Sequence, residues 1–381
     1  MSRLYIGLMS GTSLDGADGV LVDFSGDKLR VLASATQTFS EEFRTQLLLL
    51  NSPSPNELHL AALAANQLAE AYAEVVASLL KQSKLMAKDI QAIGAHGQTV
   101  RHQPESGYTT QLNNPALLAE RTGIDVVADF RSRDVAAGGQ GAPLVPAFHQ
   151  SVFGQAKAPT QASRLASTQM STRSSTLVLN IGGISNLSVL PATGDVLGFD
   201  CGPGNALMDA WCWQHKQRRF DTDGQWAASG KLIPQLLDSL LDEKYFALPP
   251  PKSTGRDLFS TVWLAGKLQP FGSQRPEDIQ NTLTKLTASA CIMGVSSYIN
   301  NSEELIVCGG GAYNLYLMQQ LQAGLPSLKV TSSDAHGLPP LQVEAAAFAW
   351  LARQTTQRLP GNLPSVTGAA GLRVLGAIYP A

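Results

Sequence analysis

Two segments far apart in the chain share one pattern, and this recurrence constrains the fold more than any other feature. An apolar run starting at Leu4 enters a small polar turn, and a second apolar run leaves it and ends at Phe24. Segment 176–190 repeats the arrangement, with Gly182 and Gly183 in its turn. Each segment predicts a β-hairpin, because apolar runs joined by Gly, Ser, Asn and Asp favour paired strands. Because one hairpin heads each half of the chain, we expect a duplicated α/β fold whose halves face each other across a cleft.

The turn of the first hairpin predicts an anion-binding loop. It is built from Gly11, Thr12, Ser13, Asp15 and Gly16. Small residues leave the backbone N–H groups unshielded, and closely packed N–H groups form a concavity suited to phosphate oxygens. For either turn alone, a purely structural connection is the commoner interpretation and stays open. Two such turns in one chain favour a bound polyphosphate.

Composition narrows the class of protein. A chain of 381 residues with 44% hydrophobic content can fill two cores. Because 28 Lys and Arg nearly balance 30 Asp and Glu, a nucleic-acid partner is not expected. No apolar run approaches the ~18 residues of a membrane span and no signal-peptide pattern opens the chain, so we expect a cytoplasmic protein. The cysteines lack Cys-x-x-Cys spacing, which predicts buried thiols and neither zinc nor disulfides; they are Cys201, Cys212, Cys291 and Cys308.

We expect two domains, residues 1–135 and 136–365, with a tail from about 366 to 381 packing back on the first. The glycine-rich segment 138–146 does not have the spacing of a dinucleotide site, so it predicts the crossing between the halves and a hinge. Segment 154–175 is rich in Ser, Thr, Gln and Ala, and predicts an insertion without a catalytic role.

Polar side chains follow two predicted strands of the first half, where ligands commonly bind in α/β domains. A strand over 89–95 precedes His96, Gln98 and Thr99. A histidine satisfied within a capped loop is an equally weighted alternative.

The second of these strands, over 123–131, carries Asp129 and Arg131 at its end. Arg131 can clamp a carboxylate or phosphate with two parallel hydrogen bonds. It can equally pair with Asp129 or Asp134, and this alternative stays open.

In the second half, a strand from Val196 runs into Asp200, and a Gly-Pro-Gly turn and a helix follow. An aspartate there lies at the lip of a cleft near a helix N-terminus and is well placed to act as a general base. The structural alternative is that Asp200 caps the helix. Segment 251–257 is a polar loop before a helix, and the sequence leaves open whether it has a function.

A strand, three glycines and a helix follow later, and they predict an adenosine pocket. Gly309, Gly310 and Gly311 let the backbone approach a flat ligand, and the helix start that includes Asn314 offers free N–H groups. Glu344 opens an Ala-rich helix. It is either a first-turn acid stabilised by the helix dipole or a carboxylate aimed into the cleft.

Six motifs together resemble one known family over essentially the whole chain. They are Gly7–Gly16 (GLMSGTSLDG), Ala95–Thr99 (AHGQT), Ala128–Arg131 (ADFR), Leu179–Asn186 (LNIGGISN), Gly198–Asn205 (GFDCGPGN) and Val307–Asn314 (VCGGGAYN). Their architecture resembles the two-domain ATPase fold of actin, the hexokinases and the heat-shock chaperones, with duplicated ribonuclease-H-like domains. The residues of these motifs resemble those of the anhydro-N-acetylmuramic acid kinases. The insertion at 154–175 is longer than expected for that family.

The resemblance implies a kinase that uses ATP and Mg²⁺ to open the 1,6-anhydro ring of a cell-wall sugar and phosphorylate O6. It implies Asp200 as the base that activates water, Glu344 as a substrate-contacting acid, a homodimer and a role in peptidoglycan recycling. It also implies that the ATP phosphates are held by Gly11, Thr12, Ser13, Leu14, Asp15, Gly16, Ala17 and Asp18. Closure of the halves over ATP and sugar is expected as well.

Two other functions stay open from the sequence. A nucleotide-gated binding ATPase related to actin or the chaperones would need a further binding domain, and none follows residue 360. A nucleotide-independent glycosidase using Asp200 and Glu344 would turn over the sugar without ATP.

Overall fold

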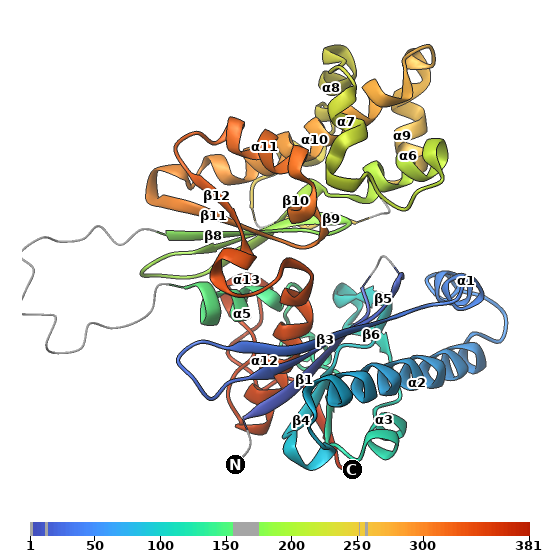
Figure 1. Ribbon diagram of the computed structural model, residues 1–381, viewed down its shortest axis with the longest axis vertical. Coiled ribbons are helices and arrows are strands. Elements are labelled where there is room, and N and C mark those ends of the chain that lie inside the picture. The colour runs from blue at the N-terminus through green and yellow to red at the C-terminus, as the bar shows by residue number, and fades with distance from the viewer. Residues whose placement is uncertain (1–2, 12–13, 155–174, 251, 256–257) are drawn as a thin grey trace, which may run out of the picture. The chain divides into compact units, whose positions relative to one another are not determined.

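The computed structural model describes residues 3–11, 14–154, 175–250, 252–255 and 258–381 (Figure 1). The chain divides into two compact units. Unit 1 comprises Met1–Phe148 and Gln342–Ala381, and unit 2 comprises His149–Leu341. These limits correct the expected domains 1–135 and 136–365, since residues 136–148 and 342–365 belong to unit 1.

Unit 1 is built on a six-stranded sheet with the order β13-β7-β4-β1-β2-β3. The three strands β1, β2 and β3 are antiparallel, β4 and β7 run parallel to β1, and β13 is antiparallel to β7. The bounds are β1 Leu4–Met9, β2 Gly16–Asp23, β3 Arg30–Thr38, β4 Ala92–Ala95, β7 Val126–Ala128 and β13 Ala377–Tyr379. The C-terminal tail therefore completes the edge of this sheet.

Unit 2 repeats the arrangement in a five-stranded sheet with the order β10-β9-β8-β11-β12. Again the first three strands form an antiparallel meander, and the next two run parallel to the first. The bounds are β8 Ser175–Ile181, β9 Ile184–Leu190, β10 Leu197–Pro203, β11 Ser302–Cys308 and β12 Lys329–Ser332. This shared topology confirms the predicted hairpins and the duplicated ribonuclease-H-like fold.

Helices cover both sheets. Those of unit 1 are α1 Glu41–Leu49, α2 Glu57–Ser83, α3 Pro115–Thr122, α4 Ser132–Ala136, α12 Val343–Thr356 and α13 Pro364–Thr367. Those of unit 2 are α6 Ala206–Lys216, α7 Gln225–Ser229, α8 Pro234–Leu241, α9 Thr261–Leu268, α10 Pro276–Ser296 and α11 Leu315–Gly324. Helix α5, Val145–Phe153, spans the boundary between the units. A hairpin of β5, Gln98–Gln103, and β6, Tyr108–Leu112, completes unit 1.

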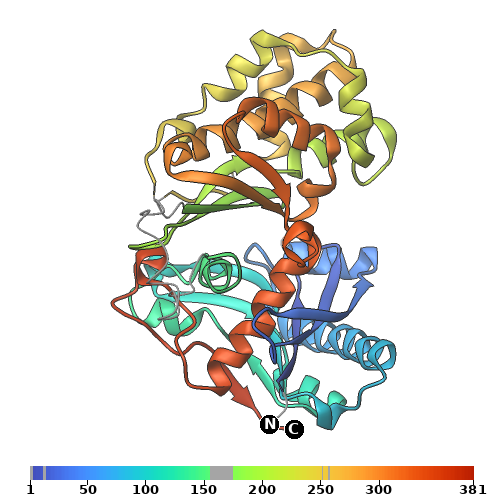
Figure 2. The ribbon, with the colours of Figure 1, turned by 60° about the vertical axis from the view of Figure 1, so that its left-hand side comes forward.

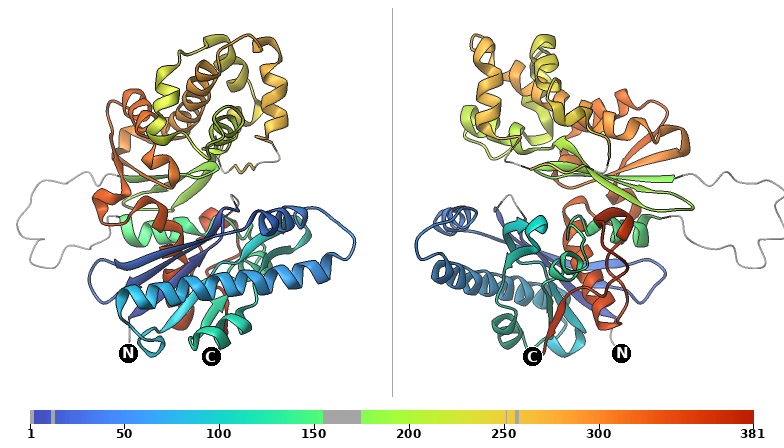
Figure 3. Two further views of the ribbon diagram at one scale, coloured as in Figure 1. Left: turned by 45° about the vertical axis from the view of Figure 1, so that its right-hand side comes forward. Right: turned by 180° about the vertical axis from the view of Figure 1, so that it is seen from behind.

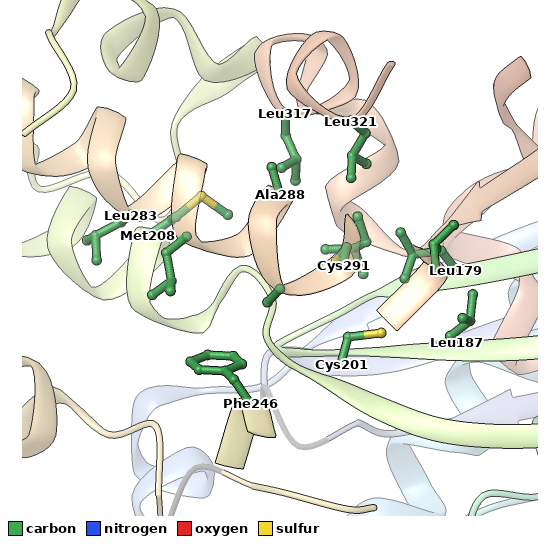
Figure 4. Close-up of a cluster of buried hydrophobic side chains, with 14 of the residues drawn as sticks. Leu179, Leu187, Cys201, Met208, Phe246, Leu283, Ala288, Cys291, Leu317 and Leu321 are labelled. Carbon is green, nitrogen blue, oxygen red and sulfur yellow. The ribbon is translucent and has the colours of Figure 1, made fainter. Parts of the chain in front are cut away.

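Each unit has its own hydrophobic core. In unit 1, Ile6 and Leu8 of β1 are fully buried in the cluster that includes the α2 side chains. In unit 2, alternate residues of β8 lie in a cluster with side chains from α10 and α11, including Leu179, Cys291 and Leu317 (Figure 4). All four cysteines are buried, as the sequence predicts. No helix in the described part of the chain combines the length and the apolar character that a membrane crossing requires.

The glycine-rich segment 138–146 is fixed within unit 1 and is not the crossing. Asp134, which is fully buried, accepts hydrogen bonds from the Gly141 N–H at 2.8 Å, the Asn362 side-chain amide at 2.7 Å and the Thr367 hydroxyl at 2.8 Å. The Gln140 N–H donates to the Thr367 carbonyl at 2.7 Å. The segment is thereby tied to the C-terminal part of the chain, and residues 155–174 of the expected insertion lie outside the described residues.

Helix α12 lies against one face of the unit 1 sheet (Figure 2), and α2 lies against the other (Figure 3). Two glycines permit the approach of α12. A Cβ atom on Gly7 of β1 would lie 1.8 Å from the Ala345 carbonyl oxygen, and one on Gly94 of β4 would lie 2.0 Å from the Phe348 carbonyl oxygen. Helix and sheet therefore touch backbone to backbone, which explains why the buried face of α12 is rich in alanine.

We expect Gly94→Ala to destabilise the protein by about 1–3 kcal/mol or more, because the added methyl group must displace helix backbone from a packed core. The comparison variant is Gly26→Ala, where the nearest atom would lie at an ordinary 3.4 Å and the effect should stay within about 0.5 kcal/mol. Urea unfolding midpoints measure both. Equal midpoints for Gly94→Ala and the wild type would disprove the close packing of α12.

Candidate active site

The turn of the first hairpin is anchored at its C-terminal end. The Leu14 N–H donates to the Gly11 carbonyl at 3.2 Å, and Leu14 adopts a left-handed φ of 58° with its side chain buried. The Asp15 carbonyl accepts the Phe39 N–H at 3.1 Å. Thr12 and Ser13, which the sequence places in the phosphate loop, lie outside the described residues.

The end of the predicted loop 11–18 is strand. Gly16, Ala17 and Asp18 belong to β2 and pair with β3. A Cβ on Gly16 would lie 2.4 Å from the Gln37 carbonyl oxygen, so this glycine serves the strand contact. The Asp18 carboxylate is exposed and accepts the Thr36 hydroxyl at 2.6 Å.

His96 and Arg131 meet in unit 1. The Arg131 guanidinium donates to His96 Nε2 from Nε at 3.2 Å and from its terminal nitrogen at 2.9 Å, and it also donates to the Gly141 carbonyl at 2.8 Å. His96 Nδ1 lies 3.3 Å from the Ser10 carbonyl oxygen. The imidazole is therefore neutral, with its proton on Nδ1. Burial and the Arg131 charge lower the pKa of His96 to about 3, so it stays neutral across the physiological range.

Gln98 lies one step further along the same network. The Ser10 hydroxyl donates to the Gln98 amide oxygen at 2.6 Å, and both residues are buried. Ser10 directly precedes the predicted phosphate loop, so His96 and Gln98 both contact the residue next to that loop. Thr99 accepts a hydrogen bond from the Gln111 amide at 3.2 Å across the β5–β6 hairpin.

Helix α12 brings Glu344 to the same cluster. Phe348, one turn further along α12, packs on the His96 ring with 4.7 Å between the ring centroids. Burial lowers the pKa of Arg131 to about 10, and the charges of Glu344 and Asp134 partly oppose this effect. His96, Gln98, Arg131 and Glu344 therefore lie together in unit 1, as a shared site requires.

Asp129 has separate contacts. It follows β7 with a left-handed φ of 60°, its side chain is exposed, and it accepts the Ser132 hydroxyl. Within the described part of the chain, its hydrogen bond is thus to its own turn at the end of β7 and not to the His96 network.

In unit 2, the turn at Gly182 and Gly183 joins β8 to β9 as predicted. Its carbonyl groups accept the N–H groups that open α6: Asn205 donates to Gly182 at 2.7 Å, and Gly204 and Ala206 donate to Gly183 at 2.9 Å and 3.3 Å. The amides at this helix start are thus already paired with the turn.

The three glycines after β11 differ in function. A Cβ on Gly309 would lie 2.4 Å from the Asn180 amide oxygen, and one on Gly311 would lie 2.4 Å from the Ile181 side chain. Both glycines are required by contacts inside unit 2. For Gly310 the nearest atom is 3.4 Å away, on Asn205, so this is the position with room beside it.

The helix after the glycines begins later than predicted. A 3-10 turn, Gly310–Tyr313, follows β11, and α11 begins at Leu315. The Asn314 side chain caps this helix by accepting the Leu317 N–H at 2.9 Å. The first turn of α11 is therefore not an open row of N–H donors.

Asp200 lies inside β10, which continues to Pro203, and not at the strand end that the sequence predicts. The pairing with β9 shifts between Asp200 and Gly202, and such bulges commonly re-aim a side chain next to an active site. The cap residue of α6 is Asn205, so the interpretation of Asp200 as a helix cap is wrong.

The polar segment 252–254 forms hydrogen bonds with Asp200. The Asp200 N–H donates to the Lys252 carbonyl at 3.0 Å, and the Thr254 N–H donates to Asp200 Oδ2 at 2.9 Å. The Tyr245 hydroxyl donates to the Asp200 carbonyl at 2.7 Å. Burial raises the pKa of Asp200, while the hydrogen bonds from Thr254 and the Ser253 side chain oppose this shift. A raised pKa makes a carboxylate a stronger proton acceptor, so Asp200 is chemically suited to act as a general base.

Sequence reasoning missed several of these partners. Ser10 and Tyr245 gave no signal of their own. The polar loop at 251–257 is visible as a motif, but nothing in the sequence shows that its residues 252–254 contact Asp200.

Comparison with known proteins gives the family. A family model described as anhydro-N-acetylmuramic acid kinase matches residues 3–381. A protein of that name from Albidiferax ferrireducens is 61% identical over 405 residues, with 100% of both chains covered. One from Variovorax paradoxus is 58% identical over 388 residues, covering 100% of this chain and 99% of the relative.

Among solved structures, a ROK family glucokinase from Streptomyces griseus in complex with glucose and AMPPNP is 15% identical, covering 92% of this chain and 99% of that chain, with a TM-score of 0.41. The family model and the relatives confirm the resemblance seen in the motifs. The chain belongs to the anhydro-N-acetylmuramic acid kinase family.

Proposed function

We propose that this chain uses ATP to open the 1,6-anhydro ring of 1,6-anhydro-N-acetylmuramic acid and to phosphorylate O6, giving N-acetylmuramic acid 6-phosphate for peptidoglycan recycling. The family membership supports this reaction, because relatives covering the whole chain carry the name of that kinase. The single structural observation behind it is the Asp200 carboxylate, held by the Thr254 N–H and raised in pKa by burial.

In this mechanism Asp200 takes a proton from a water molecule, and the water oxygen forms a bond to C1 of the sugar. The C1–O6 bond breaks and its electron pair moves to O6, which bonds to the γ-phosphorus as the bond to the leaving ADP oxygen breaks. Base-activated water and the electrophilic phosphoryl group thus stabilise opposite ends of one breaking bond. No separate acid is needed to protonate O6, because O6 forms its new bond to the γ-phosphorus as it leaves C1.

ATP binding is assigned to the loops that head the two sheets. We propose that Gly11–Asp18 holds the phosphates, with the turn itself, residues 10–15, as the binding part. Gly182, Gly183, Gly310 and Asn314 are the proposed nucleotide contacts of unit 2, while Gly309 and Gly311 allow that surface to pack. Phosphoryl transfer depends mainly on such positioning and charge neutralisation.

Mg²⁺ is the proposed metal. No group of three His, Cys, Asp or Glu side chains suited to a metal ion occurs among the described residues. Mg²⁺ is usually held by one or two carboxylates together with substrate phosphates, so this chemistry fits an ion that arrives with ATP. Asp15 and Asp18 are the carboxylates of the proposed phosphate loop 11–18, and the ion would neutralise charge on the phosphates.

For the sugar we propose His96, Gln98, Thr99, Asp129, Arg131 and Glu344 as the binding set. His96, Arg131 and Glu344 form one cluster in unit 1, and the Arg131 cation suits the lactyl carboxylate of the substrate.

A cytoplasmic location and a homodimer remain predictions, and sedimentation velocity tests the latter.

The direct test is to incubate the protein with ATP, Mg²⁺ and the anhydro sugar and to follow the sugar by mass spectrometry. The 6-phosphate should appear with one ADP per sugar opened. Sugar opening without ATP would support a glycosidase instead, and ATP turnover without any sugar product would support a nucleotide-gated binding protein.

We expect Asp200→Asn to lower kcat by about 10³-fold or more, since base catalysis and water orientation are lost together. ADP affinity should stay nearly unchanged. Asp238→Asn, at an exposed position of α8 in the same unit, is the matched control and should keep wild-type turnover. Near-normal turnover of Asp200→Asn would remove Asp200 from the mechanism.

We expect the first product to be the α-anomer, because water that attacks opposite the bridging oxygen inverts C1 of a β-linked anhydro sugar. Proton NMR within the first turnovers, before mutarotation, distinguishes the two anomers. A nascent β-anomer would argue against direct attack by water.

A further inference from the structure

Apart from the Thr254 N–H that holds the Asp200 carboxylate, segment 252–254 has no part in the function described so far, although each of its three residues bonds Asp200. Its backbone runs beside β10, with the Asp200 N–H bonded to the Lys252 carbonyl at 3.0 Å. The Thr254 N–H and the Ser253 side chain both bond the carboxylate itself. These contacts hold the position of the carboxylate relative to its own strand.

Two side chains, Lys252 and Tyr245, further fix the position of the segment. The Lys252 ammonium donates to the Tyr245 and Phe246 carbonyls at 3.3 Å each and lies 4.7 Å from the centre of the Tyr245 ring. The Tyr245 hydroxyl in turn donates to the Asp200 carbonyl at 2.7 Å. Lys252 and Tyr245 therefore connect the segment to the backbone of β10.

Thr254 carries an unmet hydrogen-bonding group next to the base. Its Oγ1 is enclosed and has no hydrogen-bond partner among the described residues, although its own N–H is 2.9 Å from Asp200 Oδ2. An enclosed hydroxyl without a partner costs free energy unless water or a ligand supplies the bond. The hydroxyl of a residue whose N–H bonds the general base is well suited to hold the water from which that base takes a proton.

We propose that segment 252–254 belongs to the catalytic site, with Thr254 Oγ1 as a second contact of the attacking water and Ser253 as the residue that positions the Asp200 carboxylate. The inference rests on the proposed function, since it assumes that Asp200 activates the water. In this step, one water proton moves to Asp200 and the water oxygen bonds to C1. The electron pair of the C1–O6 bond moves to O6, which bonds to the γ-phosphorus as the bond to the ADP oxygen breaks. Thr254 exchanges no proton in it.

The test for Thr254 compares Thr254→Val, which removes the hydroxyl at nearly constant shape, with Thr254→Ser, which keeps it. We expect kcat to fall by about tenfold or more in the valine variant, the effect of one lost hydrogen bond in the transition state, and to return largely in the serine variant. ADP affinity and the melting temperature should match the wild type. Equal kcat values for the valine variant and the wild type would overturn the role of Thr254, as would a serine variant as slow as the valine one.

The test for Ser253 is the pH profile of Ser253→Ala. The Ser253 hydrogen bond lowers the pKa of Asp200, so its removal raises that pKa, and the acid limb of kcat/KM should move to higher pH while the plateau changes less. Ser296→Ala, which loses an exposed hydroxyl on α10, is the control and should keep the wild-type profile. An unshifted limb in Ser253→Ala would overturn the positioning role.

The other titratable groups around Asp200 are the same in Ser253→Ala as in the wild type. Burial and the Asp200 charge raise the pKa of Tyr245, and the neighbouring Cys291 thiol together with burial raises the pKa of Cys201, so both stay neutral in acid. Cys291 is in contact with Cys201, and that contact lowers its pKa from the ordinary thiol range near 8.5. Burial lowers the pKa of the Lys252 ammonium from its ordinary value near 10.4.

Failure of this inference differs from failure of the proposed function. If the wild type forms no sugar 6-phosphate, or if Asp200→Asn keeps its turnover, the proposed function or the role of Asp200 fails, and the inference fails with it. If Asp200→Asn loses turnover while Ser253→Ala and Thr254→Val behave as the wild type, only the inference fails.

Discussion

Contact between helix backbone and sheet backbone in unit 1 is the constraint on which the rest of that unit depends. Gly7 and Gly94 let α12 approach β1 and β4 until carbonyl groups of the helix occupy the space that side chains would take. This approach places Phe348 on His96 and Glu344 within electrostatic reach of Arg131. The geometry of the polar cluster is therefore set by two residues that have no side chain.

The same principle separates two uses of glycine in this chain. Glycines in a nucleotide-type motif are usually interpreted as making room for a ligand. Here Gly16, Gly309 and Gly311 make room for neighbouring backbone or side chains of their own unit, while Gly310 keeps space beside it. A glycine-rich motif thus combines positions that shape the loop with positions that can face a ligand. The space that a Cβ atom would have at each glycine distinguishes the two kinds.

Much of the fold follows from the sequence. The paired apolar runs at 4–24 and 176–190 predict both hairpins, and their recurrence predicts the duplicated topology, because strand periodicity and turn chemistry are local properties. The unit boundaries do not follow in this way. The glycine-rich segment 138–146 resembles a crossing in composition, but the buried Asp134 ties it to Asn362 and Thr367, and no local pattern reports a contact over that sequence separation.

The candidate site divides in the same manner. The strand ends identified His96, Gln98 and Arg131, whose clustering is a tertiary outcome of parallel strands ending at one edge. Asp200 was found from its motif, but its place within β10 depends on a bulge that the sequence does not show. Ser10 and Tyr245 were missed because a serine before a turn and a tyrosine after a helix are common everywhere.

The division of the chain between the units has a consequence for biosynthesis. Unit 2 ends at Leu341, so its whole core is available once that residue has left the ribosome. Unit 1 needs α12, the Asp134 donors at 362 and 367, and strand β13, all of which are translated after unit 2. The half whose synthesis begins first therefore lacks one helical cover and one edge strand of its sheet until the segment after unit 2 has been translated.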